Sequence, residues 1–356
     1  MDRGLRMRYM QRIERKLNGL PWYVAEFIET KKRSFAPTTL LNYCHDYLIF
    51  FDWLAGQEAS GASSDEIALD TLEALTVRKA EQFLQHLEYT LGNHKLTVNR
   101  KLSSLKSLFD YLQNIAETRE LKPYIQRNVM AKMDLNAVKE SPETLAKSID
   151  GKILRETEFE AFRRFVMHGF GERHAHESRI RKFHLLNRER DTAIVSLILG
   201  SGLRLSEVAG IDLEDVDLER AYVRVTRKGN KKQYVYFSKQ ALADLHQYLR
   251  VRDARYRPKS RERCLFVAAA IGRKGDSRRL TARAIEKRIQ QYAAAYGKPS
   301  LTVHALRHSF ATRYHLENND VPKLKNQLGH ASIQTTMIYT HLRDEEMRHA
   351  VDRMDW

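Results

Sequence analysis

The chain has few of the features that mark secreted, metal-binding or membrane proteins. It contains only two cysteines, Cys44 and Cys264, which lie far apart, so neither a disulfide framework nor a cysteine-based zinc site is expected. No run of about 18 apolar residues could cross a bilayer. Residues 1–17 are too charged to form the apolar core of a signal peptide. We therefore expect a cytoplasmic protein without membrane insertion.

Glycine and proline are also scarce, and no internal repeat or low-complexity tract occurs. With 16 glycines, 7 prolines and 42% hydrophobic residues, the composition is that of a folded globular protein and not of a disordered or collagen-like chain. A length of 356 residues exceeds a typical single domain. Two domains are therefore expected.

Acidic residues are in deficit, but only in the second part of the chain. Residues 1–150 carry 21 basic and 20 acidic side chains, whereas residues 151–356 carry 40 and 25. An excess of positive charge favours a polyanionic partner, because each neutralised phosphate releases bound counterions. Nucleic acid is the favoured partner, and an acidic membrane surface is the competing interpretation.

The first third of the chain has the 3.6-residue apolar period of amphipathic helices, in the segments 21–32, 38–54, 81–89 and 97–112. In the last segment the apolar residues form one stripe. Its other faces carry side chains suited to phosphate contacts, namely Asn99, Arg100, Lys101 and Lys106. A solvated polar face is the alternative interpretation of these residues.

Polar residues with Pro142 and Gly151 indicate a linker between two domains. We divide the chain into an N-terminal helical domain (1–140), a linker (141–153) and a C-terminal domain (154–356). Alternating segments at 221–226 and 233–237 predict a β-hairpin, and 169–190 predicts a loop or an exposed helix. Further helices are expected at 157–168, 191–199, 239–250, 281–296, 304–317, 322–328, 333–339 and 344–354. The expected fold is mainly α with a small antiparallel β-sheet.

Chemically active side chains gather towards the C-terminus. His304 and Arg307 lie in one predicted helix, His330 follows a later glycine, and Tyr339 comes nine residues after it. Two imidazoles, a guanidinium and a phenol are what phosphoryl transfer onto a tyrosine requires. A DNA phosphodiester is the expected substrate.

Two upstream residues would complete such a site. Arg204 follows a glycine turn, and with Arg307 it could clamp the phosphate oxygens, since a guanidinium forks across two of them and stays charged. Lys228 lies in the predicted hairpin turn and could protonate the leaving oxygen, while the neighbouring Lys231 could contact phosphate. Tyr339 would be the nucleophile. Each residue alone also has an ordinary structural interpretation.

A metal site was considered for His304 and His308, which are four residues apart and could share one helix face. No glutamate follows His304 as in zinc proteases, and Arg307 between the two would repel a cation. We expect neither a metal nor another cofactor.

Four segments together resemble the tyrosine recombinase (phage integrase) family. They are Gly-Leu-Arg-Leu-Ser-Glu at 202–207, Lys-Gly-Asn-Lys at 228–231, His-Ala-Leu-Arg-His-Ser-Phe-Ala-Thr at 304–312, and Leu-Gly-His-Ala-Ser-Ile-Gln-Thr-Thr with Tyr-Thr-His at 328–341. The resemblance implies a helical, SAM-like core-binding domain and an α/β catalytic domain. It assigns catalysis to Arg204, Lys228, His304, Arg307, His330 and Tyr339. Glu207 matches an acidic companion of the first arginine, and His308 matches a position that is usually structural.

Within this family the chain is most similar to Xer recombinases, in particular the single-protein type of Firmicutes. That similarity implies double-stranded DNA with a specific core site, a 3′-phosphotyrosyl intermediate, a Holliday junction and resolution of chromosome dimers at a dif-like site. It also implies a homotetramer on DNA that exchanges C-terminal tails, with a DNA translocase as a candidate partner. The alternatives are an integrase or transposase of a mobile element, a type IB topoisomerase, and a catalytically silent DNA-binding regulator.

Overall fold

The computed structural model describes residues 3–57, 63–136, 144, 148–149, 151–227, 231–259, 262–269, 278–330 and 332–341. The chain divides into two compact units, Met1–Lys139 and Glu140–Trp356. Each unit has its own hydrophobic core. Within the described ranges, no helix combines the length and the apolar character needed to span a membrane.

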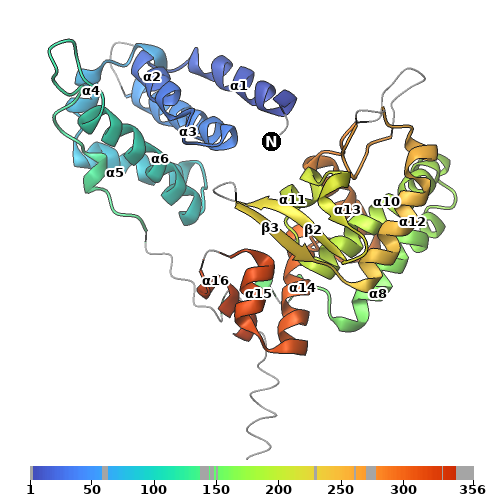
Figure 1. Cartoon of the computed structure of the whole chain (residues 1–356). Helices are drawn as coiled ribbons and strands as arrows, with labels where there is room; N and C mark the ends of the chain where they lie inside the picture. The colour runs from blue at the N-terminus through green and yellow to red at the C-terminus, as the bar shows by residue number, and fades with distance from the viewer. Residues whose placement is uncertain are drawn as a thin grey trace, which may run out of the picture. The chain divides into compact units, whose positions relative to one another are not determined.

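The regular elements of the first unit's described residues are helices, joined by loops (Figure 1). Its main helices are α1 (Arg3–Leu17), α2 (Trp22–Lys31), α3 (Pro37–Ala55), α4 (Leu69–Glu73), α5 (Val77–Gln85) and α6 (Lys95–Asn114), with short turns at Ser64–Glu66, His86–Thr90 and Met130–Lys132. The helices predicted from the apolar period are confirmed. Helix α1 was not predicted, because its sequence is basic and, of its side chains at 6–17, only Ile13 is fully buried.

Aromatic side chains build the core of the first unit. The Phe50 ring on α3 packs edge-on against Phe83 of α5 and Phe109 of α6, with centroid distances of 5.1 and 6.2 Å. The Tyr47 hydroxyl donates to the backbone oxygen of Ser104 at 2.9 Å. Edge-to-face rings add stability beyond the area that they bury. These contacts hold α3 against α6.

The second unit combines helices with one small sheet, so the predicted class, mainly α with a small antiparallel β-sheet, is confirmed. The helices are α8 (Glu156–Arg164), α9 (Phe170–Arg173), α10 (Ser178–Ser201), α11 (Leu205–Gly210), α12 (Lys239–Tyr256), α13 (Ala282–Tyr296), α14 (Val303–Asn318), α15 (Val321–Leu328) and α16 (Gln334–Met337). Short turns lie at Phe165–Gly169, Leu213–Asp215 and Ile338–His341.

The sheet has the order β1 (Val216–Asp217), β2 (Tyr222–Arg227), β3 (Lys231–Tyr236), and all pairs are antiparallel. Val223 of β2 faces Val235 of β3, and both are buried. The predicted hairpin is thus confirmed, and its register ends with Arg227 opposite Lys231. The turn residues 228–230 lie outside the described part of the chain.

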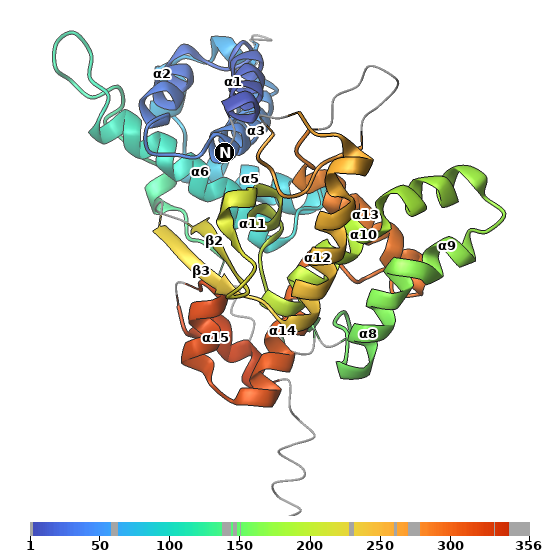
Figure 2. The same cartoon turned by 45° about the vertical axis from the view of Figure 1, so that its right-hand side comes forward.

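Helix α10 is much longer than the predicted helix at 191–199. It begins at Ser178 and runs through most of the segment for which a loop or exposed helix was expected. Its first half buries polar residues, among them His184 and Asn187, and exposes apolar ones such as Phe183. This inverted arrangement removes the hydrophobic period on which the prediction depended. Figure 2 shows α9 and the start of α10 far from the strands β2 and β3.

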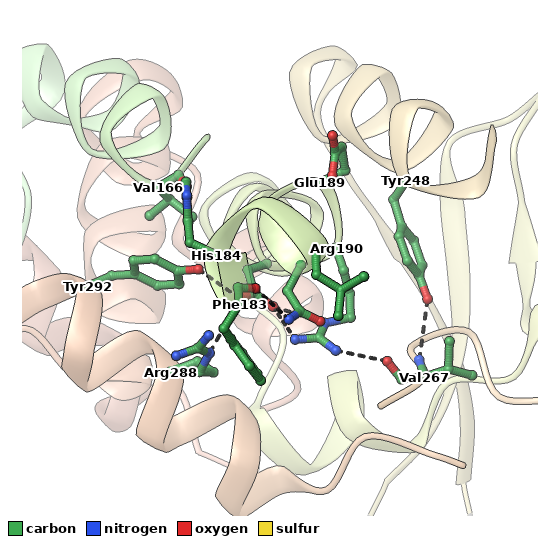
Figure 3. A network of polar contacts seen from close by, with 12 residues as sticks. Val166, Phe183, His184, Glu189, Arg190, Tyr248, Val267, Arg288 and Tyr292 are labelled. Atoms are coloured by element: carbon green, nitrogen blue, oxygen red, sulfur yellow. Dashed lines mark hydrogen bonds and ion pairs between the residues drawn. The ribbon is translucent and has the colours of Figure 1, made fainter. Parts of the chain in front are cut away.

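A network of buried polar contacts links α10 to the rest of the second unit (Figure 3). Arg190 is 2% exposed, donates from Nε and Nη2 to Asp191 at 2.9 and 2.7 Å, and donates from Nη1 to the oxygen of Val267 at 3.0 Å. Tyr292 of α13 donates to the same carboxylate at 2.8 Å. A buried charge needs such a complete set of partners, since an uncompensated one costs several kcal/mol.

Helices α14 and α15 lie side by side and are followed by α16 (Figures 1 and 2). The predicted helix at 333–339 is in fact the four-residue α16 followed by a 3₁₀ turn, Ile338–His341. The predicted tail helix at 344–354 lies outside the described residues.

Candidate functional site

A left-handed glycine places Arg204. Gly202 ends α10 with φ +71°, a conformation that favours glycine, and a Cβ there would come within 2.5 Å of the Phe310 ring. The chain therefore turns sharply and enters α11 three residues later, at Leu205. Arg204 is the residue immediately before α11, and its side chain is partly exposed.

Glu207 joins two guanidinium groups. Its Oε1 accepts from Arg204 at 2.9 Å and from Nε of Arg227 at 3.1 Å, while Oε2 accepts from the backbone N–H of Arg204 at 2.9 Å. Arg204 also donates from Nη2 to the oxygen of Gly329 at 3.0 Å. The carboxylate thus offsets the repulsion between the guanidinium groups of Arg204 and Arg227, and it fixes the orientation of the Arg204 guanidinium.

Arg307 of α14 is the most enclosed cation of this group, with 2% of its surface exposed. It donates to the oxygen of Gly202 at 2.5 Å, to the oxygen of Leu328 at 2.8 Å and to Nε2 of His330 at 3.1 Å. Burial lowers the pKa of Arg307 to about 10, and the charge of Arg204 acts in the same direction. Two guanidiniums held close together in a poorly solvated place favour binding of an anion.

His330 lies between Arg307 and the last described helix. Because Arg307 donates to Nε2, the ring carries its proton on Nδ1, which contacts Oγ1 of Thr336 at 2.9 Å. Burial and the charge of Arg307 lower the pKa of His330 to about 4. His304 is exposed, and partial desolvation with the charges of Arg307 and Arg204 lowers its pKa as well. Both rings are therefore neutral near pH 7.

Tyr339 is buried, with 1% of its surface exposed, in a small cluster with Ala311, Leu324 and Leu328. Its hydroxyl contacts Nδ1 of His308 at 2.8 Å. Burial raises the pKa of the phenol to about 12, although the charges of Arg307 and Arg204 oppose this shift. The phenol is thus protonated and within electrostatic reach of both arginines.

Five of the six predicted catalytic residues consequently lie in one region of the second unit. Arg307 contacts His330 directly, and Arg204 and Arg307 donate to the adjacent backbone oxygens of Gly329 and Leu328. The charges of both arginines act on the phenol of Tyr339. The ring of His304 packs edge-on against His308 at 4.2 Å. Lys228 lies outside the described residues. The neighbouring Lys231, predicted to contact phosphate, is exposed at the start of β3.

Three of the predicted DNA-contacting residues of α6 have partners inside the first unit. Arg100 pairs with Asp46 through two bonds of 2.5 and 2.8 Å. Lys101 is 6% exposed, with Nζ at 3.5 Å from the same carboxylate. A phosphate contact by Lys101 would require this buried pair to open.

Asn99 exchanges two hydrogen bonds of 2.9 Å with the backbone of Asn136, and so holds the end of the described first unit against α6. Lys106, in contrast, is partly exposed. Contacts of these side chains with DNA remain predictions.

Sequence reasoning overlooked Arg227. Its buried guanidinium contacts Glu207, the side chain of Gln233 at 2.7 Å and the oxygen of Gln327 at 2.9 Å. It thereby joins β2 to α11 and α15. The available signal was the alternation of β2, which places Arg227 on the same face as the buried Val223 and Val225.

Comparison with known proteins shows which family the chain is similar to. The model of the phage integrase family matches residues 173–346. The chain is 34% identical over 360 residues to tyrosine recombinase XerS of Lactococcus lactis subsp. cremoris, covering 98% of this chain and 99% of that protein. It is 35% identical over 356 residues to XerS of Streptococcus mutans serotype c, covering 97% and 98%.

Solved structures share the fold at lower identity. The XerH recombinase bound to a palindromic difH substrate superposes with a TM-score of 0.64 at 20% identity, over 93% of this chain and 94% of that one. The Tn1549 transposon integrase in complex with transposon right end DNA gives 0.61 at 17% identity, over 93% and 98%. The full-length match to XerS proteins decides the assignment: the chain belongs to the phage integrase family and is a tyrosine recombinase of the Xer type.

Proposed function

We propose that this enzyme cuts and rejoins DNA strands at a specific site through a 3′-phosphotyrosyl intermediate. The observation that carries the proposal is the convergence of Arg204, Arg307, His330 and the Tyr339 phenol, which come from separate elements of the second unit. The DNA phosphodiester suits this site, because two fixed guanidiniums can bind its non-bridging oxygens.

In the proposed reaction the oxygen of Tyr339 attacks the scissile phosphorus. Arg204 and Arg307 stabilise the negative charge of the pentacoordinate transition state, and Lys228 protonates the departing 5′ oxygen. His304 binds the same phosphate as a neutral donor, and His330 joins it when the phosphate replaces Thr336 as the acceptor of its Nδ1 proton. The tyrosyl ester conserves the energy of the broken bond, so a 5′ hydroxyl of the partner strand can reverse the step without a cofactor. Two such exchanges produce and then resolve a Holliday junction.

The buried position of Tyr339 adds a requirement to this proposal. With 1% of its surface exposed, the phenol can meet a phosphodiester only after the residues that cover it move aside. We propose that assembly of four subunits on DNA, with exchange of the C-terminal tails, drives this movement. Arg204 and His304 are the more accessible members of the site and would meet the phosphate first.

The names of similar proteins suggest the biological substrate. One structural neighbour is bound to difH, and another to transposon right end DNA. We favour a dif-like chromosomal site and resolution of chromosome dimers, because the XerS proteins match nearly the whole chain at 34% and 35% identity, whereas the two structural neighbours match it at 20% and 17%. A DNA translocase is the proposed regulator. A mobile-element role is the alternative, and mapping cleavage on genomic DNA separates the two: a site near the replication terminus supports the first, and one at an element's end the second.

A suicide substrate tests the proposed chemistry. Incubation with a nicked duplex that loses its 5′ fragment after cleavage should trap a protein–DNA adduct that resists SDS. Tyr339→Phe removes only the nucleophilic oxygen, and should abolish the adduct while DNA binding persists in a mobility-shift assay.

Tyr314→Phe is the matched control, since this phenol packs beside the same cluster, and it should form adduct at the wild-type level. An adduct with Tyr339→Phe would mean that another residue is the nucleophile. No adduct with the unmodified protein on any duplex that it binds specifically would favour a silent DNA-binding regulator. Relaxation of supercoils by a monomer at no defined site would identify a topoisomerase instead.

A further inference from the structure

His308 is the histidine that touches the proposed reacting oxygen. Its Nδ1 lies 2.8 Å from the hydroxyl of Tyr339, and the two ring centroids are 5.7 Å apart. The helix α14 that carries His308 also carries Arg307 and His304. The position of the phenol is therefore tied to the helix that supplies the phosphate clamp.

The other two imidazoles of the site are placed differently. His330 has both nitrogens in contacts, with Arg307 and with Thr336. His304 is exposed and packs its ring on His308. Among the described residues, His308 is the imidazole in hydrogen-bond contact with the phenol.

The surroundings of His308 keep its ring neutral. Burial lowers its pKa to about 3, and the groups that face it act in the same direction: His304 one turn earlier, the adjacent Arg307, and His330. A neutral imidazole that receives a hydrogen bond from a phenol accepts at Nδ1 and carries its own proton on Nε2. We assign this tautomer to His308, so that the Tyr339 hydroxyl donates and Nδ1 accepts.

We propose that His308 is a catalytic residue that takes the proton of Tyr339 as the tyrosyl ester forms. This inference rests on the proposed function. The phenolic O–H bond breaks, its proton goes to Nδ1, and the oxygen forms the new bond to phosphorus while the bond from phosphorus to the 5′ oxygen breaks. His308 holds the proton during the covalent intermediate. It returns the proton to the phenolic oxygen when the 5′ hydroxyl attacks, gives its own proton to the Lys228 amine that was deprotonated in cleavage, and rejoins the strand.

The phenolic proton shared by Tyr339 and His308 has a different preferred position before the reaction and during it. In the DNA-free protein the proton stays on the phenol, which prevents premature ionisation. As the bond to phosphorus forms, the oxygen loses its basicity, so the proton must leave. The incoming phosphate also adds negative charge beside Arg307, His304 and His330, whose positive charge or polarity disfavours protonation of His308. Transfer is therefore coupled to ester formation.

The test compares two substitutions in the full-length protein under single-turnover conditions, with preformed complexes on the nicked duplex. His308→Ala should slow adduct formation by about 10²–10⁴-fold, the usual effect of losing a general base. Added imidazole should restore part of the rate, because the truncation leaves space for it. His308→Asn keeps a hydrogen-bond acceptor but no base, so its rate should rise more steeply between pH 6 and 9 than that of the unmodified protein.

His246→Ala, on the exposed face of α12, is the matched control and should keep the wild-type rate without an imidazole effect. DNA binding and helical content show whether each variant is folded. If His308→Ala cleaves faster, the contact restrains the phenol and the proposal is wrong. It is equally wrong if both substitutions cleave at the unmodified rate, or if imidazole leaves a folded, slow His308→Ala variant unchanged. Failure of the unmodified protein to form any adduct would overturn the proposed function itself.

Discussion

At the scale of single residues, the site depends on backbone positions as much as on charged side chains. Gly329 ends α15 with φ +64°, and its oxygen accepts from Arg204 at 3.0 Å. A Cβ at this position would lie 1.8 Å from Nη1 of Arg227. That guanidinium is buried and bonded to Glu207 and to Gln327, so it cannot swing away freely.

Gly329→Ala should therefore damage both stability and catalysis. A non-glycine residue in the left-handed region costs about 1–2 kcal/mol, and the displaced Arg227 adds to this cost. We expect a lower melting temperature and a strongly reduced rate of adduct formation. Gly92→Ala is the control, because Gly92 has φ +62° with open space around it. Equal effects of both substitutions on cleavage would show that the Arg227 contact has no role.

At the scale of elements, α14 organises the site. Thr302 begins this helix, and its hydroxyl accepts from the N–H of Ala305 at 3.1 Å. The first turns then place His304, Arg307 and His308 within one short stretch of backbone. If the first turn of α14 unwound, His304 would be displaced first, because it is closer to the start of the helix and more exposed than Arg307 and His308.

Thr302→Ala should cost about 1 kcal/mol of stability through loss of this cap, and it should also slow cleavage. Thr281→Ala is the matched control, since Thr281 caps α13 in the same way at 3.2 Å but far from the catalytic residues in sequence. We expect a similar loss of stability from both in denaturant unfolding, and slower adduct formation only from Thr302→Ala. Thr302→Ser should restore the cap and the rate. Equal slowing by Thr281→Ala would point to a global cause.

At the scale of the whole molecule, the two units have separate buried cores. The first unit is closed by hydrogen bonds of its own between distant segments, such as those of Asn99 with the backbone of Asn136. A core of this size suffices for a domain of about 140 residues to fold alone. The fragment 1–139 should therefore show the circular dichroism of a helical protein and one cooperative thermal transition. A fragment that melts without cooperativity would mean that its stability depends on residues 140–356.

Sequence patterns correctly predicted the elements in which apolar side chains recur with the period of a helix or a strand. The amphipathic helices of the first unit and the β2–β3 hairpin bury regular apolar positions, so their existence could be predicted. The length of helix α10 was underestimated, because its first half buries polar residues. Contacts with distant segments, such as those of His184 and Arg190, stabilise these residues, and no local sequence pattern predicts such contacts. The helix α1 was missed for the related reason that its surface is mostly basic and exposed.

The amino-acid sequence by itself determined which reaction the site residues are suited to. The motifs around Arg204, Arg307, His330 and Tyr339 specify residue types that suit transfer of a phosphoryl group to a tyrosine, and side-chain chemistry is readable without coordinates. Tertiary structure alone decided the distances and the environment: that Arg227 joins the elements around the site, that the phenol is buried, and that His308 is its partner. These facts depend on segments far apart in the chain packing together, and such contacts leave no regular period in the sequence.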